Sequence, residues 1–227
     1  MLILGVDTSG RKGSVALARG DAESFEVLEM TDLTGGMYSA QLIPAVTKLL
    51  EACASRKSDL DGFAVASGPG SFTGLRVGLS AVKGLAEILG KPIAAISVLE
   101  AIAATSDQDG RTIAALDAGR KEVYVGEFEV RGGKLTRVRE SLLTQAEFSA
   151  LLDAQPGAEL ITPDASISDL AGMHLHLKQI EPPNAGDFAR LGVRKILAGE
   201  VVATDALEAN YIRRSDAEIF SKGGRGN

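Results

Sequence analysis

A glycine-rich block in the first third of the chain constrains the fold more than any other feature. It follows a short apolar run, Phe63–Ala66, which predicts a buried strand. The run Gly68–Gly70 ends that strand, because glycine reaches backbone angles closed to other residues and the proline between them fixes φ. Apolar residues then recur at helical spacing as far as Leu89, with Ser71 or Thr73 as the expected N-cap. The block therefore predicts a strand, a tight turn and a long packing helix.

The predicted helix has an apolar stripe and, beside it, a second face with almost no side chains. Another backbone can approach such a smooth face closely. The residues of this face are Gly74, Gly78, Ala81 and Gly84. If it lies exposed beside the helix that begins near Gln41, the two helices form an apolar patch that needs a partner. The residues predicted for this partner interface are Gln41, Pro44, Leu75, Arg76, Gly78, Leu79, Ala81 and Val82.

Composition limits the class of protein. With 227 residues, 45% of them hydrophobic, the chain can bury a sizeable core in one domain or two small lobes. Its formal charge of -6 argues against a broad basic surface for nucleic acid, so we expect any RNA to be held through a partner. No apolar run reaches the ~20 residues that span a bilayer and no secretory leader is evident, so we expect a cytoplasmic protein. The single Cys53 lies on an apolar helical stripe and is expected to be a core thiol.

The order of predicted elements indicates an α/β fold with two lobes. Three strands, a helix, the strand at Phe63, the glycine-block helix and a further strand and helix occupy the first ~105 residues. The polar stretch Asp107–Gly110 is the predicted boundary between domains of residues 1–106 and 107–227. The second half again begins with a strand that ends in aspartate and turns into another strand, which indicates an internal duplication. A later helix, near 187–198, is expected to pack back on the first lobe.

Two aspartate-ended strands are the candidate chemical site. Asp7-Thr8-Ser9 and Asp117-Ala118-Gly119 resemble the phosphate-facing hairpins of the actin, sugar-kinase and heat-shock ATPase superfamily, in which the aspartate orients Mg²⁺ or water. Gly70 joins them as a residue whose backbone N–H can face phosphate. The tentative nucleotide-facing residues are Asp7, Thr8, Ser9, Gly70 and Asp117. The alternative interpretation is structural, with Asp7 capping a turn and the glycines letting a helix start close to the sheet.

Other signals for chemistry are weak. The glycine spacing matches neither the dinucleotide fingerprint nor a P-loop, and no lysine follows Gly74 as a P-loop requires. His174 and His176 share one face of a predicted strand, but no third ligand is near them in the sequence. We therefore expect no metal site and no catalytic residue in this chain.

Taken together, the motifs resemble those of the TsaB (YeaZ) family of accessory proteins in bacterial tRNA threonylcarbamoyladenosine synthesis. The segment Ser67–Gly78 is a highly specific signature, and the others gain weight from their order along nearly the whole chain. The matching segments are Ile3–Ser9, Ser39–Pro44, Ser67–Gly78, Leu116–Tyr124 and Asn210–Arg213.

The resemblance implies a duplicated β-β-β-α-β-α fold of the actin and Hsp70 type, with a reduced second lobe. It implies a non-catalytic paralogue that dimerises with TsaD, works with TsaE, contacts tRNA only through the complex and forms a homodimer when alone. TsaD-like enzymes hold a metal with two histidines, and Val98 and Ile102 stand at those places here. Neither can ligate a metal, which also argues against a zinc peptidase. ATP or ADP is expected, if at all, at the interface with TsaD, and the alternative function is an actin-like ATPase or small-molecule kinase.

Overall fold

The computed structural model describes residues 1–171, 176–210 and 212, which form two units. The first unit contains residues 1–105 and 181–209, and the second contains the described residues of 106–180 together with 210 and 212. The predicted domains, 1–106 and 107–227, therefore differ from the observed units, because the chain returns to the first unit after residue 180. No helix within the described ranges combines the length and apolar character needed to cross a bilayer.

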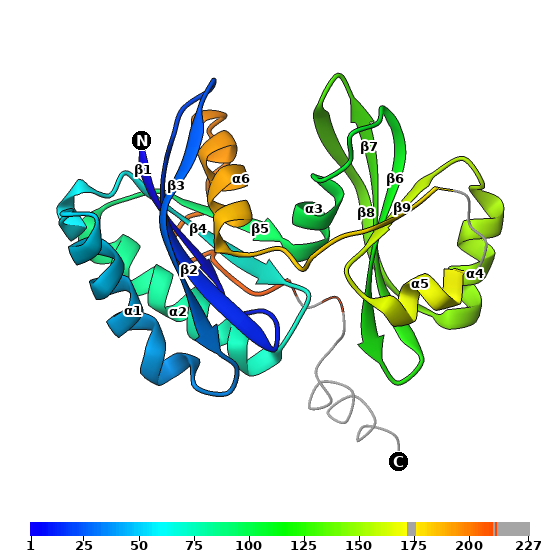
Figure 1. Cartoon of the computed structure of the whole chain (residues 1–227), viewed down its shortest axis with the longest axis horizontal. Coiled ribbons are helices and arrows are strands. Elements are labelled where there is room, and N and C mark those ends of the chain that lie inside the picture. Colours follow the sequence, from blue (N-terminus) through cyan, green and yellow to red (C-terminus); the bar gives the residue numbers. More distant parts are fainter. Residues whose placement is uncertain (172–175, 211, 213–227) are drawn as a thin grey trace, which may run out of the picture. The chain divides into compact units, whose positions relative to one another are not determined.

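A five-stranded mixed sheet forms the centre of the first unit (Figure 1). Its strands, in chain order, are β1 (Leu2–Asp7), β2 (Lys12–Gly20), β3 (Phe25–Thr34), β4 (Gly62–Gly68) and β5 (Ile93–Ser97). Their order across the sheet is β3-β2-β1-β4-β5, with β1, β4 and β5 parallel and the hairpin-connected β2 and β3 antiparallel. This arrangement brings the ends of β1 and β4 together, since Val6 pairs with Val65.

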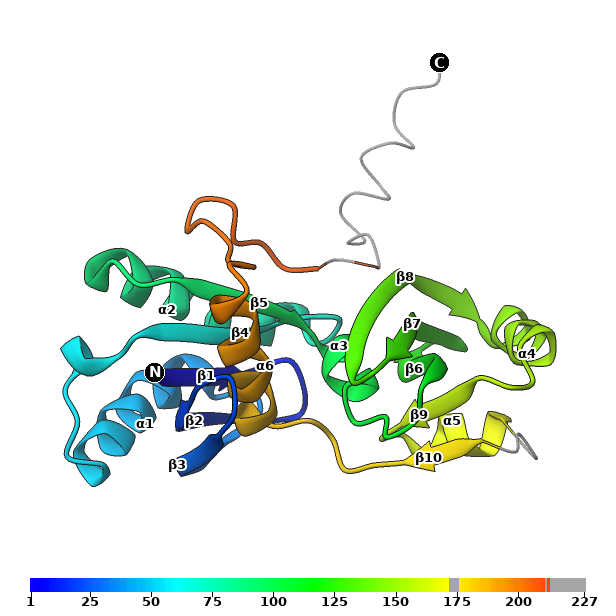
Figure 2. The ribbon, with the colours of Figure 1, turned by 90° about the horizontal axis from the view of Figure 1, so that it is seen from above.

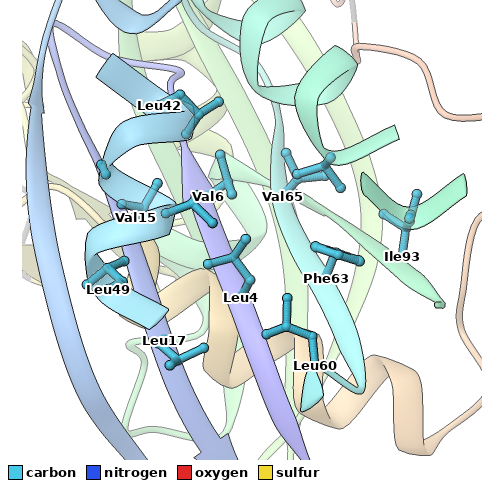
Figure 3. Close-up of a cluster of buried hydrophobic side chains, with 14 of the residues drawn as sticks. Leu4, Val6, Val15, Leu17, Leu42, Leu49, Leu60, Phe63, Val65 and Ile93 are labelled. Carbon is cyan, nitrogen blue, oxygen red and sulfur yellow. The ribbon is translucent and has the colours of Figure 1, made fainter. Parts of the chain in front are cut away.

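Helices cover both faces of this sheet because successive strand residues point to opposite sides. Leu4 and Val6 of β1 belong to the cluster that α1 and α2 cover, and Figure 3 shows these strand residues facing Leu42 and Leu49 of α1. Gly5, between them, faces α6 on the other side, and a Cβ at this position would collide with the Ala185 carbonyl. The helices of this unit are α1 (Tyr38–Ala52), η1 (Lys57–Asp59), α2 (Phe72–Leu89), α3 (Val98–Ala103) and α6 (Ala185–Leu197).

Helix α6 joins the first unit through packing and capping, although more than 80 residues separate it from α3 in the sequence. The Ala185 amide of α6 donates to Ser14 Oγ at 2.9 Å. Asn184 caps the helix, because its Oδ1 accepts from the Gly186 amide at 2.9 Å. The buried Phe188 and Val193 face the sheet, and full burial of such a side chain stabilises a fold by roughly 1.5–3 kcal/mol. These contacts account for the return of residues 181–209 to the first unit.

The second unit repeats the arrangement of the first, which confirms the predicted duplication and α/β fold class. Its sheet order is β10-β9-β6-β7-β8, the same path as β5-β4-β1-β2-β3. Helices α4 and α5 cover one face (Figures 1 and 2), and both are shorter than their counterparts α1 and α2. The elements are β6 (Gly110–Gly119), β7 (Glu122–Arg131), β8 (Lys134–Thr144), α4 (Gln145–Ala154), β9 (Glu159–Thr162), α5 (Ala165–Ala171) and β10 (Leu177–Gln179).

Edge strands and short helices are where the sequence pattern was least informative. Strand β3 continues to Thr34 because backbone pairing with β2 carries it through polar residues such as Glu29 and Asp32. Helix α5 was not predicted, since its seven residues contain a single fully buried apolar side chain, Ile167. Periodicity alone does not reveal an element that buries so little.

Part of the smooth face of α2 packs against another segment of this chain. Gly74 and Gly78 are buried against the end of β1, where a Cβ would collide with the Thr8 carbonyl and the Thr8 hydroxyl respectively. The expectation of close approach by another backbone is confirmed, but the approaching backbone is this chain's own. Gly84, farther along α2, meets no atom within 4 Å and is exposed.

We expect opposite effects from replacing these glycines by alanine. Gly74→Ala places a methyl group against backbone that cannot turn away, and we expect a loss of about 1–3 kcal/mol in the free energy of unfolding. Gly84→Ala fills no occupied space and favours the helix, so we expect a gain of about 0.5–1 kcal/mol. Urea denaturation of both variants tests this, and equal effects in the two variants would contradict it.

Candidate functional site

The predicted site residues of the first unit meet where β1 ends. Asp7, the last residue of β1, is 4% exposed, and its Oδ1 accepts from the Ser9 amide at 2.8 Å and the Ser9 hydroxyl at 2.6 Å. Burial penalises the charged form and outweighs these two hydrogen bonds, so it raises the pKa of Asp7 to about 6. Asp7 is therefore a carboxyl group that changes charge within one or two pH units of neutrality.

Thr8, Ser9 and Gly70 connect this strand end to the start of α2. The Thr8 hydroxyl donates to the Gly74 carbonyl at 2.8 Å, and the Ser71 amide donates to the Ser9 carbonyl at 2.7 Å. Ser71 is the N-cap, as expected, and accepts from the Gly74 amide at 3.3 Å. A Cβ at Gly70 would collide with the Ser9 carbonyl. These contacts favour a structural role for Thr8 and Gly70, the alternative that the sequence left open.

One tyrosine contributes to this region without having been predicted. Tyr38, the first residue of α1, is 5% exposed, and its hydroxyl donates to the Gly10 carbonyl at 2.8 Å. Its ring also fills the space beside Gly13, where a Cβ would be too close to it. Burial, together with the nearby Asp7 carboxylate, raises the pKa of Tyr38 above its usual value. A tyrosine at a helix start carries no periodic signal, so the sequence did not reveal this contact.

The corresponding residue in the second unit has different surroundings. Asp117 is exposed near the end of β6, and its Oδ1 accepts from the Gly119 amide at 2.8 Å. Its own amide donates at 2.8 Å to Oδ2 of Asp164, which the sequence interpretation did not select. Asp164 lies two residues after the buried strand β9, and Asp117 lies near the end of β6, so an aspartate close to a strand end was the signal that could have found it. Two carboxylates therefore lie together at this edge of the second sheet.

The part of the chain that the structure describes contains no metal-binding cluster. Within residues 1–171, 176–210 and 212, no three His, Cys, Asp or Glu side chains are grouped as metal ligands. Val98 and Ile102 are buried apolar residues of α3, as their chemistry requires. His176 is exposed, and the His174 of the predicted pair lies outside the described residues.

The predicted partner interface divides into buried and accessible residues. Four of its members face the core of their own unit, and they are Leu75, Gly78, Leu79 and Val82. Pro44 and Arg76 are exposed, whereas Gln41 and Ala81 are partly exposed. The four buried residues therefore cannot offer their side chains to a partner while the helix stays packed. Large apolar side chains that are exposed on the same two helices or at their starts are Met37, Ile43, Phe72 and Ile88.

Comparison with known proteins agrees with these motifs. The sequence model of the family described as "TsaD: tRNA N6-adenosine threonylcarbamoyltransferase" matches residues 32–165. The curated "tRNA threonylcarbamoyladenosine biosynthesis protein TsaB" of Bacillus subtilis is 38% identical over 139 residues, 61% of this chain and 59% of that protein. The protein of the same name from Escherichia coli is 26% identical over 96% of both chains. The chain belongs to the TsaB (YeaZ) family.

The fold agrees with this assignment. The solved structure "YeaZ from Pseudomonas aeruginosa" superposes with a TM-score of 0.76 and 26% identity, covering 92% of this chain and 99% of that one. The match therefore extends over nearly the whole length of both chains. The B. subtilis alignment, in contrast, spans little more than half of that relative. Membership in the TsaB family thus rests on the fold of nearly the whole chain as well as on its motifs.

We predict that the buried Asp7 makes stability depend on pH. Because its folded pKa is raised above the unfolded value of 3.8, the folded state binds the proton more tightly, and stability falls as pH rises through about 6. Asp7→Asn removes this dependence. We expect the unfolding free energy of the wild type, relative to Asp7→Asn, to fall by roughly 2 kcal/mol between pH 4.5 and 7.5. Urea unfolding at the two pH values measures it, and a constant difference would show that Asp7 titrates normally.

Proposed function

We propose that this chain acts in tRNA threonylcarbamoyladenosine biosynthesis as a non-catalytic subunit that dimerises with a TsaD protein. The observation that carries the proposal is its membership in the TsaB family, with a match to the E. coli protein over 96% of both chains. The TsaD family model, which matches residues 32–165, indicates that this chain is a relative of the transferase itself. A two-fold interface uses the same patch on both subunits, so we propose that a related protein of the same fold takes the place of a second copy.

The lack of catalysis follows from the chemistry of α3. A divalent metal requires N, O or S ligands, and the side chains at the two relevant places, Val98 and Ile102, are hydrocarbons buried in the core. Glu100, which lies between them in the sequence, forms an ion pair with Lys195 of α6 at 2.8 Å. We infer that α3 has a structural role here and that the transfer reaction takes place on the partner.

The partner surface that we propose lies on the exposed sides of α1 and α2. These helices pack against each other on one face of the first sheet, and their inward sides form the core. Ile43 is 48% and Ile88 is 82% exposed, and such large apolar side chains on two adjacent helices favour a protein partner. The interface therefore involves Gln41, Pro44, Arg76 and Ala81, with Ile43 and Ile88 added. The same surface serves a homodimer when TsaD is absent.

A charged substitution on this surface tests the proposal. We expect Ala81→Arg to weaken the complex with TsaD by at least about tenfold, because a buried unpaired charge is costly in an interface. Ala150→Arg, at an exposed position of α4 in the second unit, is the matched control and should leave binding unchanged. Mass measurement and titration of the purified pair provide the readout. Unchanged affinity in Ala81→Arg, with the fold intact by circular dichroism, would refute this surface.

We further propose that ATP or ADP binds only at the surface shared with TsaD, and that TsaE and tRNA are reached through that complex. The isolated chain should therefore hydrolyse no ATP. This outcome separates the subunit from the alternative, an actin-like ATPase or small-molecule kinase. Turnover by the purified chain that disappears in Asp7→Asn would favour the alternative. The absence of turnover in both proteins, with tRNA modification dependent on adding the chain to TsaD, would support the subunit.

A further inference from the structure

A pocket in the second unit lies outside the regions considered so far. It has a volume of about 350 Å³ and opens between the start of β6, the bulged parts of β7 and β8, and the end of α4. Its apolar surface comes from Phe128 and Val138, and its polar groups include two arginines, Arg111 and Arg139. Arg111 stands six residues before Asp117 on β6, which corresponds to about 20 Å along an extended strand. The pocket is therefore separate from the pair of carboxylates at the other end of β6.

The two guanidinium groups are held by one continuous chain of hydrogen bonds. Arg111 Nη1 donates to Gln155 Oε1 at 3.3 Å, and Gln155 Nε2 donates to Glu127 Oε2 at 3.0 Å. The other oxygen of Glu127 accepts from Arg139 Nε in a short ion pair. Glu127 is mostly buried, with 12% of its side chain exposed, whereas 59% of the Arg139 side chain is exposed. The carboxylate thus lies below the guanidinium group that it orients.

This arrangement leaves N–H groups of Arg111 and Arg139 available at the mouth of the pocket. A guanidinium carries five N–H donors, and the chain of hydrogen bonds uses one from Arg111 and one from Arg139. The second carboxylate of the lining, Glu129, pairs with Arg131 at 2.6 Å. The pocket and its rim therefore hold three cations against two carboxylates, and both carboxylates are already paired. Two neighbouring cations, Lys134 and Arg137, add to this balance, although Arg137 lies 4.0 Å from Glu140.

We propose that the Arg111–Arg139 pocket binds a phosphate group. A planar guanidinium group can donate two parallel hydrogen bonds to two oxygens of one phosphate. Two guanidinium groups that line the same pocket can therefore bind a single anion together. The tether through Gln155 and Glu127 orients both groups before the ligand arrives, which lowers the entropic cost of binding. We assign the phosphate to a free anion, and binding of an RNA phosphodiester by the isolated chain is a separate outcome that the test distinguishes. This inference does not depend on the partner surface of α1 and α2.

Nuclear magnetic resonance of the full chain tests the proposal, with inorganic phosphate and a short single-stranded RNA as separate probes. We expect saturable shifts of the amides of Phe128, Val138 and Gln155, beyond those that potassium chloride causes at equal ionic strength. Arg111→Gln and Arg139→Gln should each weaken binding about tenfold, and Arg139→Lys should weaken it less because it keeps the charge but loses the fork. The matched control is Arg56→Gln, which removes an exposed Asp-paired arginine of the first unit.

Each result has a defined meaning. Shifts with inorganic phosphate identify a site for a free anion, and shifts only with RNA identify a phosphodiester site. No shifts with either probe would overturn the proposal, as would an equal loss of binding in Arg56→Gln. Thermal melting of each variant establishes that the fold is retained. Because no TsaD is present, a failure here leaves the proposed role in tRNA modification unaffected, and a failure of the TsaD complex leaves this pocket unaffected.

Discussion

The junction between the end of β1 and the start of α2 is the interaction on which the first unit depends. The Thr8 hydroxyl reaches the Gly74 carbonyl, and the Ser71 amide reaches the Ser9 carbonyl, so strand and helix share hydrogen bonds at their closest point. Only glycine at positions 74 and 78 permits this approach. The glycine signature of the family therefore has a physical explanation that does not require a ligand: it allows a helix to pack directly on a strand end.

The two units share one arrangement of strands, but the equivalent aspartates in them differ chemically. Both place an aspartate near the end of the first strand of a sheet, but Asp7 is buried and accepts hydrogen bonds from Ser9, whereas Asp117 is exposed beside Asp164. Burial raises the pKa of Asp7 to about 6, while its counterpart Asp117 stays available to solvent.

Specialisation as a subunit is consistent with what the core contains. Where the related transferases are expected to carry metal-binding histidines, this chain has Val98 and Ile102, which add to the apolar interior. The outward sides of α1 and α2 keep large apolar residues exposed, at Ile43 and Ile88. Exposed apolar side chains of this kind agree with the proposed partner surface, and the apolar residues of α3 agree with the proposed non-catalytic role.

Local pattern was enough to predict the order of strands and helices in the first unit, the duplication, and an N-cap at Ser71 or Thr73, because periodicity and turn residues act over a few positions. It indicated that the helix near 187–198 returns to the first unit, but it was not enough to decide which side of α2 meets the core, or that Tyr38, Asp164 and Gln155 join polar networks. Those outcomes depend on contacts between distant segments, such as Ala185 with Ser14. Sequence by itself determined the elements and the family, and tertiary packing decided which of their faces are exposed, because burial is a property of the assembled chain.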